Sequence, residues 1–257
     1  MINFLHSISN VTIAIVIILS GLFFSTAIPC YVRWKFNLNP SEHFAKGAEE
    51  GFKLFTSITL LLIAFSLVRV QGDHRNVEDL VSRESAIIVK LNRALISYGG
   101  RDAAELRVDL KEYASSLVED EWPKMSERDR SEASANKLID ITQGVRLLDP
   151  KSSVQQLARS EILIALTQLS DVREARLSAS HLELPFYLSE ALTVSILMLI
   201  VFGWFQNPLP KMVAYVGGVT IGVALLLTLL IVLEGIFLGE SRVSSEPIAR
   251  ILPLIGP

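Results

Sequence analysis

Residues 54–68 read LFTSITLLLIAFSLV, and no charged residue occurs between Lys53 and Arg69. The hydrocarbon core of a bilayer is crossed by roughly 20 apolar residues in a helix. Within it, only a helix or a closed barrel satisfies the backbone polar groups. Lys53 and Arg69 can extend their charged ends toward the two interfaces, which lengthens the span. This stretch is therefore predicted to be a membrane-crossing helix.

Three other stretches share this apolar character, and together the four predicted spans are 11–28, 52–70, 186–205 and 212–233. No charge occurs between Glu190 and Lys211, or between Lys211 and Glu234. With 257 residues, 50% of them hydrophobic, and a mean hydropathy of +0.42, the chain is too apolar for an ordinary soluble domain. The first span is interpreted as a retained helix, because no Lys or Arg precedes it as in a cleaved signal.

The segment between the second and third spans has the opposite composition. Residues 73–183 hold 36 of the 51 charged residues, as 16 Lys/Arg and 20 Asp/Glu. No cationic excess dominates this insert and the net charge of the chain is −3, so nothing indicates nucleic acid as a partner. The predicted domains are a first transmembrane pair at 1–72, a water-facing helical domain at 73–184, a second pair at 185–235 and a tail at 236–257.

Apolar residues recur with helical spacing throughout the insert. One helix is predicted to continue from the second span to Gly99-Gly100, because no proline interrupts it. Three more are predicted near 103–117, 133–148 and 152–185, and Ser126 with Asp129 is predicted to cap the second of these. No stretch shows the alternation of apolar and polar residues that is typical of a β-strand. The predicted fold class is an all-α membrane protein with four transmembrane helices and a four-helix insert between the second and third.

The orientation in the membrane follows from the distribution of Lys and Arg. Four spans place both termini on the same side as the insert. Near the membrane the insert side offers Arg69, Arg75, Arg83, Arg173, Arg176, Arg242 and Arg250, and the opposite side offers Arg33, Lys35, Lys46, Lys53 and Lys211. Because the cytoplasmic side carries the larger positive charge, the insert and both termini are predicted to be cytoplasmic.

The residue types that usually carry catalysis or bind metals do not occur in this chain at the spacings that such sites need. The histidines His6, His43, His74 and His181 show no metal-ligand pattern, and a single Cys30 allows neither a cysteine cluster nor an intramolecular disulfide. The chain also has no nucleophile elbow and no glycine-rich phosphate loop. We therefore expect no enzyme activity, no cofactor and no metal.

A polar stripe on the second span is the first candidate site. Thr56, Thr59, Ile63 and Ser66 recur at alternating steps of three and four, which places them on one helical face. In a bundle of identical helices, such a face could line a narrow path for ions. The alternative is that these hydroxyls pack or hydrogen-bond between helices without lining anything.

Glu84 is the second candidate, because it interrupts a line of apolar residues at seven-residue spacing. A buried unpaired carboxylate is costly, so it should find a cation. Arg173 and Arg176, on the last predicted helix of the insert, are the expected partners in a structural ion pair. An ion-binding role for Glu84 is the alternative.

A set of short motifs gives the chain a family resemblance. The motifs are Leu60-Leu61-Leu62-Ile63-Ala64-Phe65, Arg75, Glu84-Ser85-Ala86-Ile87-Ile88, Tyr113, Glu121-Trp122-Pro123, Arg173, Arg176-Leu177, Pro185, Gly235-Ile236-Phe237-Leu238-Gly239 and Val243-Ser244. In this order they resemble the bacterial bestrophin-like family, from the second span onward.

The resemblance implies a pentameric anion channel in the lipid bilayer of the bacterial inner membrane. It implies that the channel conducts chloride and that the second span lines the pore. By position, Thr56, Thr59, Ile63 and Ser66 would then face the pore, although the aromatic neck of a bestrophin is missing from these four positions. Two alternatives stay open. Asp73 and the acidic excess of the insert suit a cation channel, and a non-conducting membrane scaffold or signalling protein would use the insert to bind partners.

Overall fold

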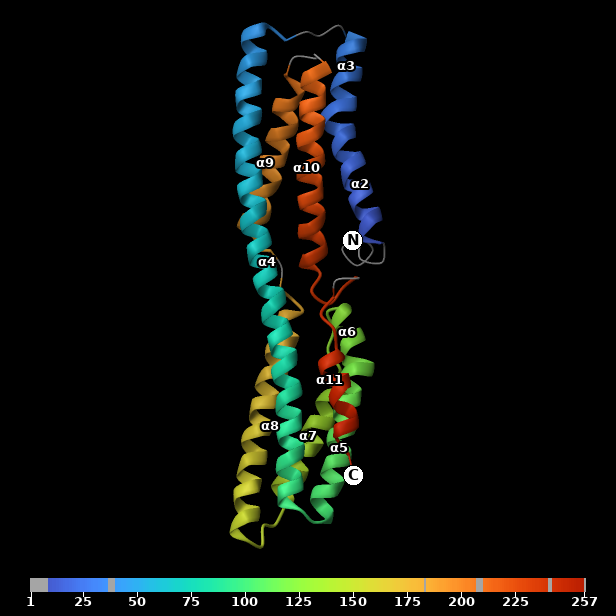
Figure 1. Cartoon of the computed structure of the whole chain (residues 1–257), viewed down its shortest axis with the longest axis vertical. Helices are drawn as coiled ribbons and strands as arrows, with labels where there is room; N and C mark the ends of the chain where they lie inside the picture. The colour runs from blue at the N-terminus through green and yellow to red at the C-terminus, as the bar shows by residue number, and fades with distance from the viewer. Residues whose placement is uncertain (1–8, 37–39, 183, 207–209, 240–241, 257) are drawn as a thin grey trace. The chain divides into compact units, whose positions relative to one another are not determined.

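The computed structural model describes residues 9–36, 40–182, 184–206, 210–239 and 242–256. Its described residues form helices and their connections, with no strand among them. They group into two compact units (Figure 1). The membrane unit comprises Met1–Gly72 and Glu183–Ser241, and the charged unit comprises Asp73–Leu182 and Arg242–Pro257.

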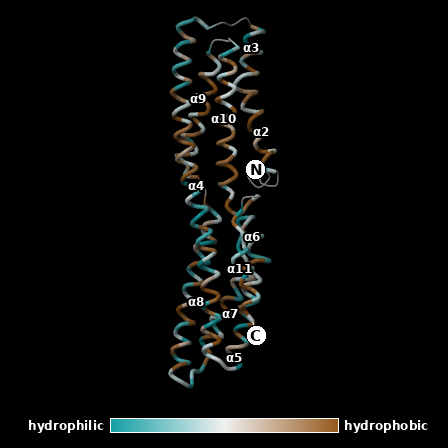
Figure 2. The backbone as a smooth tube through the Cα atoms, viewed as in Figure 1, coloured by the Kyte–Doolittle hydropathy of each residue, from teal (hydrophilic) through white to brown (hydrophobic). Residues whose placement is uncertain are grey.

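The membrane unit contains all the apolar spans. Its helices are α2 (Asn10–Leu22), η1 (Phe23–Ala27), α3 (Ile28–Phe36), the first part of α4 (Glu42–Tyr98), α9 (Phe186–Trp204) and α10 (Pro210–Glu234). Among the described residues, four helical stretches are long and apolar enough to cross a membrane, namely Asn10–Phe36, α4, α9 and α10. Figure 2 shows their hydrophobic character along the tube. The prediction of an all-α membrane protein with four such helices is confirmed.

Three of these helices share one apolar core. Ile63 of α4, Leu199 of α9 and Val223 of α10 belong to it, and α10 also packs against α2. The approach of α4 to α9 is close at Gly51, where an added Cβ atom would lie 2.5 Å from a ring carbon of Phe202. A side chain at position 51 would therefore require the Phe202 ring to move.

The charged unit is a second helical body. It holds the part of α4 from Asp73 onward, α5 (Arg101–Ser116), η2 (Leu117–Glu121), α6 (Trp122–Ser126), α7 (Glu132–Leu147), α8 (Ser153–Ala179), α11 (Glu246–Ile251) and η3 (Leu252–Leu254). As predicted, α4 ends before Gly99 and Gly100, whose φ angles of 69° and 85° suit glycine far better than other residues.

The cap of α7 differs from the prediction. Ser131, rather than Ser126, is the N-cap residue, and its side chain accepts a hydrogen bond of 3.0 Å from the backbone N–H of Ser134. The hydroxyl of Ser126 instead donates to the Pro123 carbonyl within α6. The capping prediction was wrong because α7 starts at Glu132, more than one turn later than a helix capped by Ser126 would start.

The C-terminal tail, predicted as a segment of its own, packs into the charged unit from residue 242. The Ser85 hydroxyl donates to the carbonyl of Pro247 (2.8 Å), and the indole N–H of Trp122 donates to that of Val243 (3.1 Å). These bonds attach the tail to α4 and α6.

Two short π-helical segments, η1 and η2, each end two residues before a proline, at Pro29 and Pro123. Proline has no N–H to donate to the carbonyl four residues back. In both cases the residue before the proline donates to the carbonyl five residues back, from Ile28 to Phe23 and from Trp122 to Leu117. The wider turn absorbs the lost hydrogen bond without ending the helix.

Candidate functional site

The predicted polar stripe of α4 faces the interior of its own subunit. Thr59, Ile63 and Ser66 are each 0% exposed, and Thr56 is half-buried. Thr59 donates to the Phe55 carbonyl at 2.7 Å and approaches the hydroxyl of Ser195 on α9 at 3.1 Å. The hydroxyls of Thr56 and Ser66 also donate to carbonyls one turn back.

This burial argues against the predicted pore-lining role of the stripe. A side chain covered by its own subunit cannot also face a path shared between subunits. Ile63 lies in the apolar core with α9 and α10, and Thr59 bonds across to α9. The alternative interpretation, helix packing with interhelical hydrogen bonds, describes the contacts that Thr59, Ile63 and Ser66 make.

The opposite face of α4 is apolar and exposed. It presents Leu54, Ile58, Leu61, Phe65 and Val68, at alternating steps of four and three. Their exposed fractions run from 37% for Ile58 to 71% for Val68. We call these five residues the outer face of α4. It includes Phe65, an aromatic side chain that lies off the predicted polar stripe.

A network of four buried charges lies in the charged unit. The guanidinium of Arg176 donates to both carboxylate oxygens of Glu84, from Nε at 2.6 Å and from Nη2 at 3.1 Å. The same guanidinium donates to Glu121 at 2.5 Å, and Arg173 donates to Glu121 as well. Glu84, Glu121 and Arg176 are each 0% exposed, so the pairs are shielded from water.

The charges in this network balance, because two arginines face two glutamates. Glu84 therefore has Arg176 as its partner, while Arg173 pairs with Glu121 instead. The guanidinium of Arg176 also lies 4.7 Å from the centre of the Trp122 ring. This position over the ring adds a cation–π contact to the ion pairs.

The electrostatic environment follows from burial and these partners. Burial alone would lower the pKa of Arg176, but the carboxylates of Glu84 and Glu121 raise it above its ordinary value. Burial, together with the charge of Glu84, raises the pKa of the Tyr113 hydroxyl well above its usual range. Arg176 therefore stays charged and Tyr113 stays neutral at neutral pH.

Glu121 is the network member that sequence reasoning missed. It ends the π-helical segment η2, whose wider turn changes the direction of its side chain relative to α5. A regular helical pattern does not anticipate that change. The signal in the sequence was Pro123, which removes a backbone donor just after Glu121.

Glu234, at the end of α10, has a local structural role. Its Oε1 accepts a hydrogen bond of 3.1 Å from the backbone N–H of Leu184, just before α9.

Within the described residues, no group of His, Cys, Asp and Glu side chains could hold a metal ion.

Taken together, these features define an α-helical protein of the membrane with four apolar spans and a separate charged helical unit. The chain belongs to the bestrophin-like family, because the model of the Bestrophin-like domain matches residues 52–248. The resemblance inferred from the sequence motifs is therefore confirmed.

A solved structure supports the same fold. The crystal structure of a mutant bacterial bestrophin homolog from Klebsiella pneumoniae is similar, with a TM-score of 0.65 over 93% of this chain and 97% of that chain. The sequence identity is 12%, so this likeness concerns the fold alone. Comparison with curated proteins gives no match.

The buried network predicts a large stability difference between two carboxylate substitutions. Glu84→Gln removes one of the two carboxylate charges that face the buried Arg176. The free energy of unfolding should fall by an amount toward the lower end of about 3–5 kcal/mol, because Glu121 still pairs with Arg176. The matched control is Glu174→Gln, whose carboxylate pairs with Arg130 at the surface (2.7 Å). It should cost about 0–1 kcal/mol. Thermal unfolding measures both.

Equal melting temperatures for the two variants would contradict a stabilising role for the network. Unchanged melting of Glu84→Gln combined with altered ion permeation would instead assign Glu84 to a conduction path.

Proposed function

We propose that this chain is the subunit of a homo-oligomeric ion channel, a pentamer that conducts chloride across the bacterial inner membrane. In this proposal α4 is innermost, and the charged unit and both termini are cytoplasmic. Membership in the bestrophin-like family supports the assignment. The observation that carries the pore position is the outer face of α4, which its own subunit leaves uncovered.

The geometry of α4 favours the outer face over the buried stripe as the pore lining. In a ring of identical subunits, the helix nearest the axis packs one face against the rest of its own subunit. Its opposite face points toward the axis. On α4 the packed face carries Thr59, Ile63 and Ser66, and the free face carries Leu61 and Phe65. The proposed pore lining is therefore apolar.

An apolar ring can act as a gate without a moving plug. Water leaves a narrow apolar constriction more readily than a polar one, and an ion cannot cross the dry segment without losing its hydration. Rings of Leu61 and Phe65 side chains would provide such a segment. In this proposal, conduction depends on how far apart the α4 helices of the subunits lie and on the size of these two side chains.

Exposed apolar residues on the charged unit support the proposed oligomer. On α8, Val154, Leu157 and Ile164 are exposed by 62%, 64% and 55%. Their spacing of three and seven places them on one side of that helix. Apolar patches on a charged, water-soluble body commonly mark protein interfaces, and a second copy of this chain is the partner proposed here.

The preference for anions is the part of the proposal that depends on the family resemblance. The acidic excess in residues 73–183, 20 acidic against 16 basic, favours the cation channel as the second candidate. These two channels share the architecture and differ in the charge that passes the pore.

Shortening a side chain on the outer face should raise conductance. Leu61→Ala would widen and hydrate the proposed constriction, so single-channel currents in planar bilayers should increase several-fold. The matched control is Leu225→Ala on α10, since Leu61 and Leu225 are similarly exposed at 56% and 51%. Equal currents from both variants and the parent would place the outer face of α4 against lipid.

A charge on the exposed side of α8 should weaken assembly. Leu157→Glu would bury an unpaired carboxylate in the proposed subunit interface, which lowers the mass measured for the purified protein in detergent. Gln156→Glu adds the same charge at a neighbouring exposed position and should leave the mass unchanged. A monomeric parent would end the oligomer proposal, and an unaffected Leu157→Glu oligomer would move the interface away from α8.

Ion selectivity is tested by the reversal potential under a potassium chloride gradient. The proposal expects the current to reverse near the chloride equilibrium potential. Reversal near the potassium potential would instead support the cation channel. A purified oligomer that passes no ions at all would favour a membrane scaffold.

A further inference from the structure

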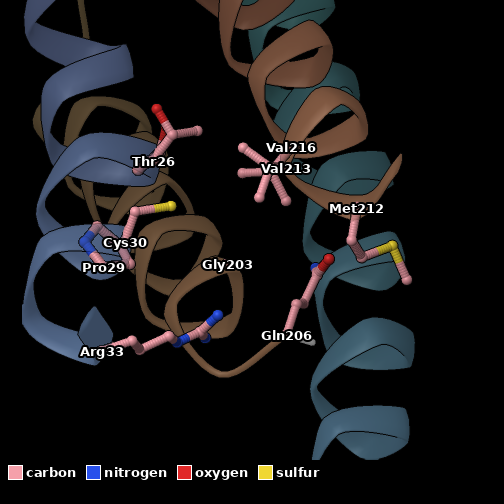
Figure 3. A pocket seen from close by; sticks show the side chains of 10 residues that line it. Thr26, Pro29, Cys30, Arg33, Gly203, Gln206, Met212, Val213 and Val216 are labelled. Carbon is pink, nitrogen blue, oxygen red and sulfur yellow. The ribbon is translucent and has the colours of Figure 1, made fainter. Parts of the chain in front are cut away.

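A small polar cavity lies at one end of the membrane unit, between α3, the end of α9 and the start of α10 (Figure 3). Its volume is about 20 Å³, enough for one water-sized particle. Thr26, Cys30 and Arg33 line it from the N-terminal helix, and Gln206, Val213 and Val216 line it from the other two. It is separate from the outer face of α4.

Gln206 is the feature of this cavity that needs a partner. Its side chain is 2% exposed, and neither its amide nitrogen nor its carbonyl oxygen has a hydrogen-bond partner among the described residues. Figure 3 shows the amide group directed toward the space between the helices. A buried amide without partners is costly to the fold, so an occupant that accepts a hydrogen bond would stabilise it.

Arg33 supplies a positive charge at the same cavity. One of its N–H groups donates to the carbonyl of Trp204, whose indole donates in turn to the carbonyl of Phe24 at 2.8 Å. No carboxylate of the described residues pairs with Arg33, although a guanidinium offers five donors. The cavity thus has a fixed cation, and its remaining N–H groups have no hydrogen-bond partner among the described residues.

The other polar groups of the lining are already engaged. The Thr26 hydroxyl donates to the Leu22 carbonyl at 2.6 Å, and Ser25 shares a hydrogen bond of 2.9 Å with Thr220. No Asp or Glu lines the cavity, and Val213 and Val216 form an apolar wall. What the cavity offers is therefore one positive charge, an amide and a thiol.

We infer that this cavity binds one small monatomic anion, a halide of the size of chloride, between the guanidinium of Arg33 and the amide of Gln206. A halide accepts hydrogen bonds from the guanidinium and from the amide nitrogen, and unlike a water molecule it also neutralises the cation. A space of about 20 Å³ suits a single monatomic ion. The inference concerns binding at a fixed site and does not depend on ion conduction.

The test compares thermal unfolding of the purified full chain in sodium bromide and in sodium gluconate at equal ionic strength. At a bromide concentration of about ten times Kd, binding should raise Tm by about 3 °C. Arg33→Gln should abolish this rise. The matched control is Lys35→Gln, which removes an equal charge from the exposed end of the same helix and should keep it.

Gln206→Glu provides a second, independent variant. Its carboxylate would pair with Arg33 and replace the bound anion, so it should raise Tm in gluconate and remove the response to bromide. This variant preserves the test if Arg33→Gln fails to fold. In crystals grown with bromide, the anomalous signal should place the ion between Arg33 and Gln206.

The inference is overturned if the parent shows no difference between bromide and gluconate, since the cavity then holds water. It is also overturned if Gln206→Glu responds to bromide as the parent does. A bromide response in a protein that passes no ions would support the site while contradicting the proposed channel.

Discussion

The constraint on which this structure depends is that polar groups removed from water must find partners inside the protein. In the membrane unit, the hydroxyls of Thr59 and Ser66 turn inward and donate to carbonyls one turn back, which leaves an apolar outer face on α4. In the charged unit the same constraint draws Glu84 and Arg176 into a balanced buried network. Gln206 and the hydroxyl of Tyr113 depart from it. Of these two, Gln206 lines the cavity at Arg33, and for that reason a ligand is expected there.

Two prolines inside helices, Pro29 and Pro123, influence where the buried network and the cavity form. Pro29 and Pro123 each remove a backbone donor inside a long helix, and the chain responds with a π-helical turn rather than a break. One such turn brings Glu121 to Arg176, and the other contains Ser25 and Thr26, which line the cavity at Arg33. Irregular turns of this kind often occur at functional positions.

The sequence was sufficient to predict the four apolar helices, the long α4 ending at Gly99 and an arginine partner for Glu84. It was not sufficient to decide which way the stripe of Thr59, Ile63 and Ser66 points, because periodicity tells which residues share a face and not what that face contacts. Nor could it place Glu121, whose position depends on the irregular turn before Pro123. Tertiary packing decides both matters.

The central claim is that the outer face of α4, and not its buried stripe, lines the ion path. Single cysteines at Leu61 and at Ile63, in a chain with Cys30 replaced by serine, test it with a charged, water-soluble thiol reagent during current recording. The account predicts that the reagent blocks current through the channel with cysteine at position 61 and leaves the channel with cysteine at position 63 unaffected. Block at position 63 without block at position 61 would contradict it.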